Sequence, residues 1–390
     1  MYDAVVIGGG PAGSRVAFIL AEQGRRVVVL ERQSSPAEKC CTGIVSVECA
    51  KTFAIPDSVI LRRVNSARLF SPSCVEIHVK RDEPQAVILD RGAFDAFMRG
   101  RAEKAGAEYR FGNKVTDVKI KSDRAIVTAS ACDKETRIET KVVVAACGYA
   151  PGLLTQLGKG EPRDFSYGAQ AEVEITGIDE IEVYFGKMAP GFFAWLAPTS
   201  PAKARAGLLS RANAGELLKK WLEKLKSKGK IASPDVPIRY GAVPIKPPAR
   251  TYGERIIAVG DAAGQVKPTT GGGICYGLIG ADIAAGILDK ALNENNLSEK
   301  SLARYEKAWR RKLGGELRTG YRARKLFERM NEAQIDQLFK VIERCGIDEE
   351  LLKTPEISFD WHSGLIKTLF KYHVVMRALN IVKTPFNKIN

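Results

Sequence analysis

The chain has 390 residues, 45% hydrophobic and 27% charged, which is ordinary for a globular protein of two or three domains. Basic residues exceed acidic ones by 15, which favours anionic partners such as phospholipid surfaces or phosphorylated substrates, although a basic host proteome would explain it equally well. The three histidines and eight cysteines have no metal or iron–sulfur spacing, and no nucleic-acid-binding module is recognisable, which argues against zinc chemistry, a Ser-His-Asp triad and a nucleic-acid partner.

The first 32 residues have the order strand, glycine turn, helix, strand and acidic residue. In such a unit, Gly8 permits the tight turn, Gly10 lets backbone N–H groups approach a pyrophosphate, and Gly13 lets the helix pack closely on the strand. The helix N-terminus faces the phosphates, and Glu31 is placed to accept hydrogen bonds from ribose hydroxyls. This order predicts dinucleotide binding; the alternative is a glycine-rich turn that binds nothing.

The middle of the chain is rich in alternating, strand-like patterns. Residues 33–50 are expected to form a loop with a short helix, residues 60–90 to form strands, and Asp90-Arg91 to open a helix that ends near residue 105. Further strands are expected at 115–120, 125–129, 141–146, 168–175, 181–185, 192–196 and 204–209. An amphipathic helix is expected at 214–229.

A second candidate nucleotide contact lies far along the chain. A strand over 256–260 ends at Asp261, and a glycine turn at 271–273 opens a helix over 274–292. Asp261 could hold a polyol hydroxyl, and the turn amides could stabilise negative charge on a flavin ring. One dinucleotide unit with this distal strand end fits FAD better than NAD alone; the alternative is a structural turn with a helix cap.

These elements predict an α/β protein with α+β insertions, in which a Rossmann-type FAD-binding domain accompanies a β-sheet substrate domain and a helical C-terminal region. We expect a discontinuous FAD-binding domain over 1–65, 91–155 and 240–298, a substrate domain over 66–90 and 156–239, and the helical region over 299–390. No apolar segment approaches the roughly 20 residues that span a bilayer. With scattered thiols, this predicts a cytoplasmic protein, or one peripheral on the inner face of the cell membrane.

The chain resembles the FAD-dependent oxidoreductases of the aromatic-hydroxylase fold and, within them, the geranylgeranyl reductase family. The general marks are the glycine motif at 8–13, the Asp90-Arg91 pair and Gly260-Asp261-Ala262-Ala263-Gly264. The closer marks are Cys41-Thr42-Gly43-Ile44-Val45-Ser46, similar to a loop of archaeal members, Phe193-Ala194-Trp195-Leu196-Ala197-Pro198, similar to a Tyr-x-Trp-x-Phe-Pro motif, and Tyr305-Glu306-x-x-Trp309-Arg310. The resemblance runs from residue 1 to about 345. It departs where Phe193 replaces a tyrosine and Ala197 a phenylalanine, which bears on the substrate more than on the cofactor.

The resemblance implies FAD as the cofactor and no metal. The cofactor-binding residues that it implies are Gly8, Gly10, Ala12, Gly13, Glu31, Arg32, Cys41, Thr42, Gly43, Arg91, Val115, Gly148, Asp261, Gly272, Gly273 and Ile274. It implies that Phe193 and Trp195 contact substrate, within a larger aromatic group that includes Tyr184, Phe185 and Phe192. Cys41 is the implied catalytic thiol near the flavin: it could give a proton, position the substrate or only pack against the ring, and Cys40 remains an alternative.

The activity implied by the resemblance is the reduction of C=C bonds in geranylgeranyl chains of archaeal membrane-lipid precursors. No second Rossmann unit is visible, so the electron donor is expected to be a ferredoxin-like carrier or NAD(P)H. The basic residues of the C-terminal region could serve a phosphate-headed substrate or form a solvated face, and residues 365–376 could lie on a membrane or pack as a helix. Two alternatives stay open: a flavin monooxygenase acting on a small aromatic compound, and a non-catalytic flavin- or lipid-binding protein.

Overall fold

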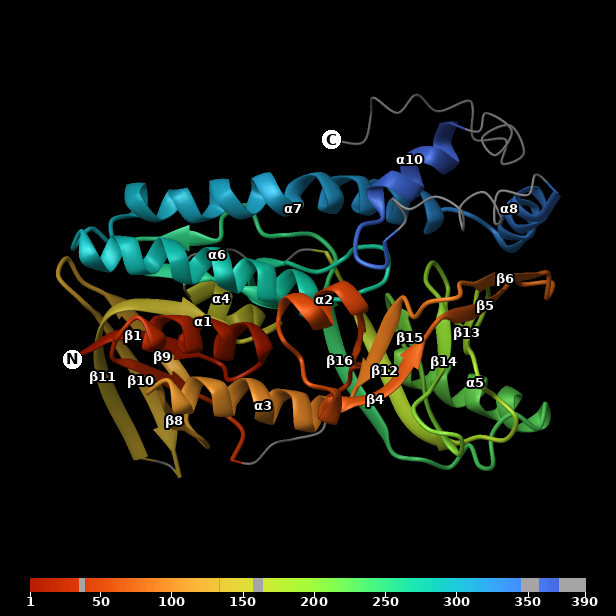
Figure 1. Cartoon of the computed structure of the whole chain (residues 1–390), viewed down its shortest axis with the longest axis horizontal. Coiled ribbons are helices and arrows are strands. Elements are labelled where there is room, and N and C mark those ends of the chain that lie inside the picture. The colour runs from red at the N-terminus through yellow and green to blue at the C-terminus, as the bar shows by residue number, and fades with distance from the viewer. Residues whose placement is uncertain (35–38, 133, 157–163, 345–357, 372–390) are drawn as a thin grey trace. The chain divides into compact units, whose positions relative to one another are not determined.

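The computed structural model describes residues 1–34, 39–132, 134–156, 164–344 and 358–371 (Figure 1). The chain divides into two compact units, the first over 1–38, 91–165 and 243–317, and the second over 39–90, 166–242 and 318–390. These limits differ from the domain limits expected from the sequence. Residues 39–65 belong to the second unit, and helix α7 (Glu299–Phe327) has residues in both.

The first unit is built on a sheet with the strand order β17-β18-β11-β1-β2-β8, from which β10 and β9 extend beside β11. Its strands are β1 (Tyr2–Ile7), β2 (Val27–Leu30), β8 (Glu108–Arg110), β9 (Lys114–Ile120), β10 (Ala125–Ala131), β11 (Lys134–Ala145), β17 (Tyr252–Gly253) and β18 (Ile256–Ala258). β1 runs parallel to β2 and β11, and β11 runs parallel to β18. Residues 4–7 and all of β2 are buried, as expected for parallel strands covered on both faces.

Helices cover one face of this sheet. α1 (Pro11–Glu22) begins after Gly10, with proline at its first position, and it buries Val16, Ala17 and Leu20. α3 (Arg91–Lys104) and α6 (Ile274–Asn293) pack against α1 (Figure 1). The other face is covered by the antiparallel pair β9–β10, and a short helix, α4 (Pro151–Gln156), contacts β9.

The second unit contains a seven-stranded sheet, in the order β16-β12-β15-β14-β13-β5-β6, and a three-stranded sheet, in the order β3-β7-β4. The larger sheet consists of β5 (Ser66–Phe70), β6 (Glu76–Lys80), β12 (Phe165–Glu174), β13 (Ile181–Tyr184), β14 (Ala194–Pro198), β15 (Lys203–Ser210) and β16 (Ile238–Pro244). The smaller sheet consists of β3 (Ile44–Ser46), β4 (Ile60–Val64) and β7 (Ala86–Leu89). The α/β class and the expected strands of both units are confirmed, but β3 was expected to be loop.

Helices of the second unit cover both faces of the larger sheet. α5 (Ala214–Ser227) buries Leu218, Trp221, Leu222 and Leu225 on one face. α8 (Glu332–Arg344) packs on the other face through Ile335 and Phe339. The described part of this unit also contains α2 (Val47–Thr52) and α10 (Ser363–Lys371). Residues 372–376 of the expected surface segment lie outside the described residues.

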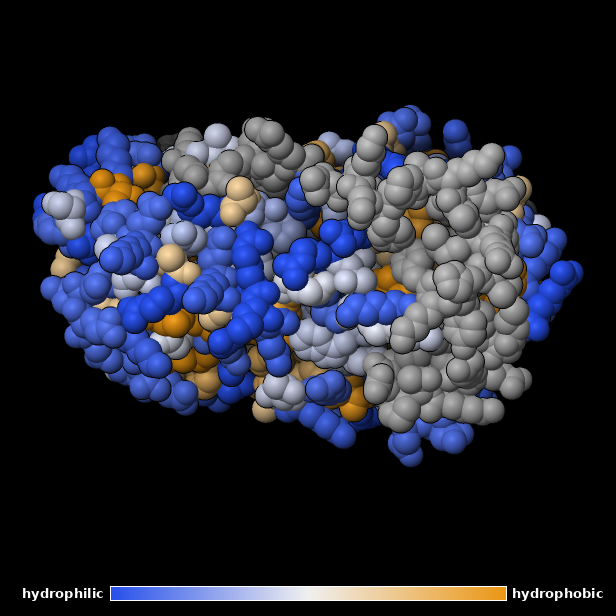
Figure 2. Space-filling model, turned by 90° about the horizontal axis from the view of Figure 1, so that it is seen from above, coloured by the Kyte–Doolittle hydropathy of each residue, from blue (hydrophilic) through white to orange (hydrophobic). Residues whose placement is uncertain are grey.

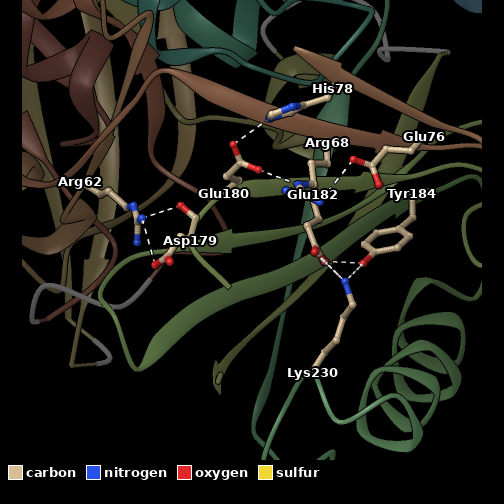
Figure 3. Close-up of polar contacts among 9 residues, drawn as sticks. All are labelled: Arg62, Arg68, Glu76, His78, Asp179, Glu180, Glu182, Tyr184 and Lys230. Carbon is tan, nitrogen blue, oxygen red and sulfur yellow. Dashed lines mark hydrogen bonds and ion pairs between the residues drawn. The ribbon is translucent and has the colours of Figure 1, made fainter. Parts of the chain in front are cut away.

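A partly buried ion pair links Lys230, which follows α5, to this sheet (Figure 3). The Lys230 ammonium lies 2.6 and 2.7 Å from the two carboxylate oxygens of Glu182, and it donates to the Tyr184 hydroxyl at 2.9 Å. The Tyr184 hydroxyl also donates to Glu182. Burial, together with Glu182, raises the pKa of Tyr184. The side chains of Glu182 and Tyr184 therefore form one polar anchor on the face that α5 covers.

Helix α7 has one buried and one charged side. Its buried residues recur at helical spacing: Leu302, Tyr305, Trp309, Leu313 and Leu317. Basic residues on the other side are exposed: Arg311, Lys312, Arg318 and Arg322. Figure 2 shows a face of the molecule on which hydrophilic residues cover most of the described surface, with small separate hydrophobic groups. The basic side of α7 is thus a solvated face.

Candidate cofactor and substrate sites

Several of the expected cofactor residues gather at one edge of the first sheet, whereas Cys41, Thr42 and Gly43 belong to the second unit. The glycine loop follows β1, Glu31 follows β2, Gly148 follows β11, and Asp261 follows β18. Because these four strands are parallel, their carboxyl ends lie at the same edge. In open α/β sheets this edge is where nucleotides bind.

The three motif glycines have different surroundings. Gly8 has a φ of +103°, and a Cβ added to it would lie 2.5 Å from the carbonyl oxygen of Ala146. A Cβ on Gly13 would lie 2.1 Å from the carbonyl oxygen of Gly8. A Cβ on Gly10 would meet no described atom within 4 Å. Gly8 and Gly13 are therefore required by the fold, whereas Gly10 leaves open space in front of the α1 N-terminus, as an approaching pyrophosphate requires.

The Glu31 carboxylate is held by two backbone groups. Its Oε2 accepts from the Gly9 N–H at 2.9 Å, and its Oε1 accepts from the Gln33 N–H at 3.0 Å. These bonds fix the carboxylate beside the glycine loop, where a ribose hydroxyl could reach it. The neighbouring Arg32 is exposed. Burial raises the pKa of Cys147 to about 11, and the positive charge of Arg32 partly opposes this rise.

The strand end at β18 meets the glycine loop. A Cβ on Gly260 would lie 3.0 Å from the Cβ of Ala12, so the first turn of α1 touches this strand end. A Cβ on Gly273 would lie 2.7 Å from Oδ1 of Asp261, which places Asp261 against the turn that opens α6 at Ile274. Burial raises the pKa of Asp261 to about 6, against the opposing influence of Arg91.

A buried chain of hydrogen bonds supports this strand end from behind. The Gly260 N–H donates to Oε1 of Gln265 at 2.8 Å, and Nε2 of Gln265 donates to the Tyr305 hydroxyl at 2.9 Å. Tyr305 in turn donates to the carbonyl oxygen of Ala258 at 2.7 Å. The Trp309 indole donates to Thr251 at 2.9 Å. Tyr305 and Trp309 of the Tyr305-Glu306-x-x-Trp309-Arg310 motif thus support, through hydrogen bonds, the strand end that carries Asp261.

The remaining expected cofactor residues occupy less diagnostic places. Gly148 has a φ of +67°, and Arg91 forms an ion pair with Asp95 at 2.8 Å. Val115 pairs with Ala129 beside an irregularity between β9 and β10 and packs on the core. A Cβ on Gly272 would lie 2.7 Å from Cε of Lys267. Their contacts with a cofactor stay predictions.

In the second unit, the segment 40–43 lies across one face of the larger sheet. The Thr42 hydroxyl donates to Oε1 of Gln170 at 3.1 Å, and Nε2 of Gln170 donates to the carbonyl oxygen of Cys41 at 3.3 Å. Nη1 of Arg205 donates to the carbonyl oxygen of Thr42 at 2.6 Å and to that of Leu89 at 3.0 Å. Gln170 stands alone between the buried alanines of β12, and that isolated polar residue is the only sequence signal for this arrangement.

The two adjacent thiols have different environments. The Cys40 sulfur lies 3.8 Å from the position of a Cβ on Gly168 and 3.7 Å from that on Gly241, so this side chain packs onto the sheet. Burial, together with the neighbouring Cys41, raises the pKa of Cys40 to about 12. The Cys41 sulfur instead accepts a hydrogen bond from the Gly43 N–H at 3.4 Å. Cys40 is therefore a packed, neutral thiol, and Cys41 is the better candidate for chemistry.

Aromatic side chains share that face of the sheet. Ring centroids lie 6.0 Å apart between Phe193 and Trp195, and 6.1 Å apart between Phe185 and Phe193. Phe185 also contacts Phe327 of α7 at 5.5 Å and Phe339 of α8 at 5.6 Å. The sequence indicated no role for these two helical phenylalanines, because nothing local shows which strand a distant helix will cover.

Two aromatic residues expected in this group lie elsewhere. Tyr184 stacks on Phe70 at 4.9 Å and meets Trp221 of α5, because successive side chains of a strand point to opposite faces. Phe192 is buried, with the guanidinium of Arg324 4.3 Å above its ring. Arg324 is itself buried and donates to the carbonyl oxygen of Gly191 at 2.8 Å. It therefore differs from the exposed basic residues of α7.

Comparison with known proteins gives relatives over nearly the whole chain. Residues 1–160 match the family model described as an FAD binding domain. The chain is 31% identical to the digeranylgeranylglycerophospholipid reductase of Methanocaldococcus jannaschii, over 89% of this chain and 93% of that protein. It is 29% identical to digeranylgeranylglycerophospholipid reductase 2 of Methanopyrus kandleri, over 94% of this chain and 98% of that protein.

Solved structures share the fold. A geranylgeranyl bacteriochlorophyll reductase-like protein from Thermoplasma acidophilum superposes with a TM-score of 0.84 at 21% identity, covering 98% of this chain and 99% of that one. A p-nitrophenol 4-monooxygenase from Pseudomonas putida superposes with a TM-score of 0.68 at 18% identity, covering 92% and 99%. The FAD match agrees with the open glycine loop and the fixed Glu31 carboxylate, and FAD is the cofactor of this chain.

Proposed function

We infer the activity from one premise: the chain belongs to the digeranylgeranylglycerophospholipid reductase family, and it is an FAD-dependent oxidoreductase. We propose that it saturates C=C bonds in the geranylgeranyl chains of glycerophospholipids. One observation carries this proposal, namely that the Cys41 segment and the pair Phe193 and Trp195 lie on the same sheet face. A long hydrocarbon chain without polar groups requires an aromatic and aliphatic lining, with few polar groups at the reacting bond.

Reduced FAD would supply a hydride when it is bound, and the loop after β1 and Glu31 would hold its phosphates and ribose. Saturation of a C=C bond also requires one proton, and we propose the Cys41 thiol as its donor. The Gly43 N–H that donates to this sulfur would stabilise the negative charge left when the proton departs.

The electrons come from outside the chain. The described residues contain a single strand–glycine–helix dinucleotide unit, and FAD accounts for it. We propose that a ferredoxin-like protein or NAD(P)H reduces the flavin between turnovers. Anaerobic flavin reduction rates with each donor decide between them.

The direct test uses mass spectrometry. Protein reduced with dithionite is mixed with a geranylgeranylated phospholipid, and we expect mass gains of one H₂ per saturated bond. Cys41→Ala should lower the rate of saturation at least tenfold, whereas Cys40→Ser, the matched control, removes the neighbouring thiol at nearly the same side-chain size and should retain most of the rate. No mass gain with any geranylgeranyl lipid would overturn the proposed activity, and equal rates for Cys41→Ala and wild type would overturn the role of Cys41 alone.

A monooxygenase is the second candidate, because a p-nitrophenol 4-monooxygenase shares the fold. That reading predicts a stable oxygen adduct of the reduced flavin and a hydroxylated product from a phenol. The third reading, a non-catalytic flavin- or lipid-binding protein, predicts FAD binding without product under every donor. Reduced protein exposed to oxygen with and without a phenol separates the monooxygenase from the reductase. The lipid mass assay separates the non-catalytic protein from the reductase.

We further propose that the protein works at the membrane surface. Among the described residues, none of the helices combines the length and the apolar character needed to cross a bilayer. The net charge of +15 and the exposed arginines of α7 favour anionic lipid headgroups instead. Sedimentation with anionic vesicles at low salt should carry the protein down, and about 0.5 M salt should release it, because screening shortens the range of the attraction. Equal binding to neutral vesicles would contradict an electrostatic attachment.

A further inference from the structure

We propose that Gln170 and Arg205 are positioning residues, which hold the Cys41–Thr42 segment in the place that the reaction requires. This rests on the function proposed above, in which Cys41 supplies the proton. Neither residue belongs to a motif that the sequence marks out. Both bind backbone carbonyl groups of the segment, and Gln170 also binds the Thr42 hydroxyl, but none of these hydrogen bonds involves the sulfur.

The sheet places both side chains on the face that carries the aromatic pair. Gln170 of β12 is paired with Gly207 of β15, which is paired with Trp195 of β14. Arg205 is two residues from Gly207 and is paired with Ala197. Directly paired residues project to the same side of a sheet, and so do residues two apart along a strand. Gln170, Arg205 and Trp195 therefore share one surface.

Gln170 uses both ends of its amide on the segment. Its Nε2 donates to the Cys41 carbonyl oxygen and its Oε1 accepts from the Thr42 hydroxyl, while the residue is only 4% exposed. A buried amide that loses such partners leaves buried polar groups unsatisfied. The two contacts therefore fix the peptide that follows the Cys41 side chain.

Arg205 joins the segment to the end of β7. One guanidinium nitrogen donates to the carbonyl oxygens of Thr42 and Leu89, and the Leu89 N–H donates to the carbonyl oxygen of Gly43 at 2.9 Å. The planar guanidinium imposes its own geometry on the groups it binds. On the other side of Cys41, the Cys40 side chain packs against Gly168 and Gly241. The backbone on both sides of Cys41 is thus fastened to the same sheet.

This arrangement determines where the Cys41 sulfur stands. A misplacement of about 1 Å in a reacting group can cost a hundredfold in rate. Loss of the Gln170 or Arg205 contacts should therefore lower the turnover number. The KM for lipid should stay nearly unchanged, because Phe193 and Trp195 are not altered.

The test combines single variants with a double-mutant cycle. Gln170→Leu removes both amide contacts, and Gln170→Glu keeps the acceptor for Thr42 but cannot donate to Cys41. Arg205→Met removes the guanidinium at similar length. Lys203→Met is the matched control, because it removes a cation from the same strand whose ion pair with Glu172 is exposed. Each is made in the wild type and in Cys41→Ala, and FAD content is measured throughout.

We expect Gln170→Leu, Gln170→Glu and Arg205→Met to lower the turnover number about tenfold or more, with the KM within about twofold of wild type. In Cys41→Ala the same changes should have no further effect, since residues that act through one group are not additive. Lys203→Met should change neither value. Further losses of the same size in Cys41→Ala would overturn the positioning role.

A second readout is independent of lipid turnover. The rate at which iodoacetamide modifies Cys41, followed by peptide mass spectrometry, should rise at least threefold in Gln170→Leu and Arg205→Met, because the freed segment exposes the thiol. It should stay unchanged in Lys203→Met. An unchanged or lower rate in both test variants would show that these residues do not hold the segment, even if the proposed activity itself failed.

Discussion

At the scale of single residues, Gly10 and Gly13 occupy one motif but have opposite surroundings. Gly10 has φ −72° and ψ 179°, which any residue adopts, and a Cβ there meets no described atom within 4 Å. Gly10→Ala should therefore fold with unchanged or slightly higher stability, yet bind FAD at least tenfold more weakly, about 1.4 kcal/mol, because the Cβ occupies the pyrophosphate approach.

Gly13→Ala should behave differently. Its Cβ collides with the Gly8 carbonyl oxygen at 2.1 Å, so the free energy of unfolding of the FAD-free protein should fall by about 1–3 kcal/mol. Flavin fluorescence titration and urea unfolding measure both variants. A destabilised Gly10→Ala that still binds FAD at wild-type strength would contradict the assignment of the open glycine.

Asp261 should make stability depend on pH in the FAD-free protein. Burial raises its pKa from 3.8 to about 6, so its contribution is fully present below about pH 4 and is lost as the pH rises through about 6. Asp261→Asn lacks this titration. The variant should therefore gain about 3 kcal/mol relative to wild type between pH 4 and pH 7. Urea unfolding at several pH values checks this, and a constant difference would count against a raised pKa for Asp261.

The placement of the glycine loop and Glu31 in the fold could be predicted from the sequence, because their signal is local. Gly8, Gly13 and Glu31 lie within one strand–turn–helix–strand unit, and the spacing alone places them. Gln170 and Arg205 could not be predicted as partners of the Cys41–Thr42 segment, because their hydrogen bonds to it join residues 129 and 163 positions apart. Choosing between Cys40 and Cys41 likewise required the packing of Cys40 on Gly168 and Gly241.

At the scale of elements, the pairing of β14 with β15 depends on Gly207. Trp195 lies directly opposite, and a Cβ on Gly207 would lie 2.4 Å from Cζ2 of its indole. Gly207→Ala should lower the free energy of unfolding by about 1–3 kcal/mol, shift the tryptophan fluorescence and weaken lipid binding, while FAD binding is retained. Gly315→Ala, on α7 where a Cβ meets no described atom within 4 Å, is the control and should be neutral or stabilising. Similar losses in both variants would contradict a local clash.

The partly buried ion pair after α5 offers a second element-scale prediction. Lys230→Met removes the cation that faces the Glu182 carboxylate, whose side chain is only 9% exposed, and should lower the free energy of unfolding by about 3 kcal/mol. The double variant Lys230→Met with Glu182→Leu should recover most of that loss, because no charge then remains buried. Urea unfolding of the two single variants and the double variant measures the coupling. Additive losses would show that the pair has no interaction energy.

The elements themselves could be predicted better than their partners. Alternation indicated β12 to β15 with small errors at their ends, and the spacing of apolar residues indicated α5 and α6. Residues 44–46 were expected to be loop, because three residues carry no measurable period and become a strand only by pairing with β7. Tyr184 was grouped with Phe193 because the two residues are near in sequence. The grouping failed because strand residues near in sequence can point to opposite faces.

At the scale of the whole molecule, each compact unit is assembled from three separate stretches of chain. The first unit contains the glycine loop, Glu31 and Asp261, and the second contains Cys41, Trp195 and the sheet that fastens the Cys41 segment. Such division follows from long-range strand pairing, for example β18 beside β11, which no local pattern reveals. Residues 39–65, which the sequence analysis groups with the glycine loop, fall in the second unit.

The central claim is that FAD held by the first unit reduces geranylgeranyl C=C bonds. The most direct measurement is an anaerobic titration of the fully reduced flavoprotein with a geranylgeranylated phospholipid, followed by flavin absorbance and lipid mass together. We predict that oxidised flavin returns in step with the lipid, with one flavin reoxidised for each H₂ gained. A flavin that stays reduced in the presence of excess lipid, or that is reoxidised without any gain in lipid mass, would contradict the account.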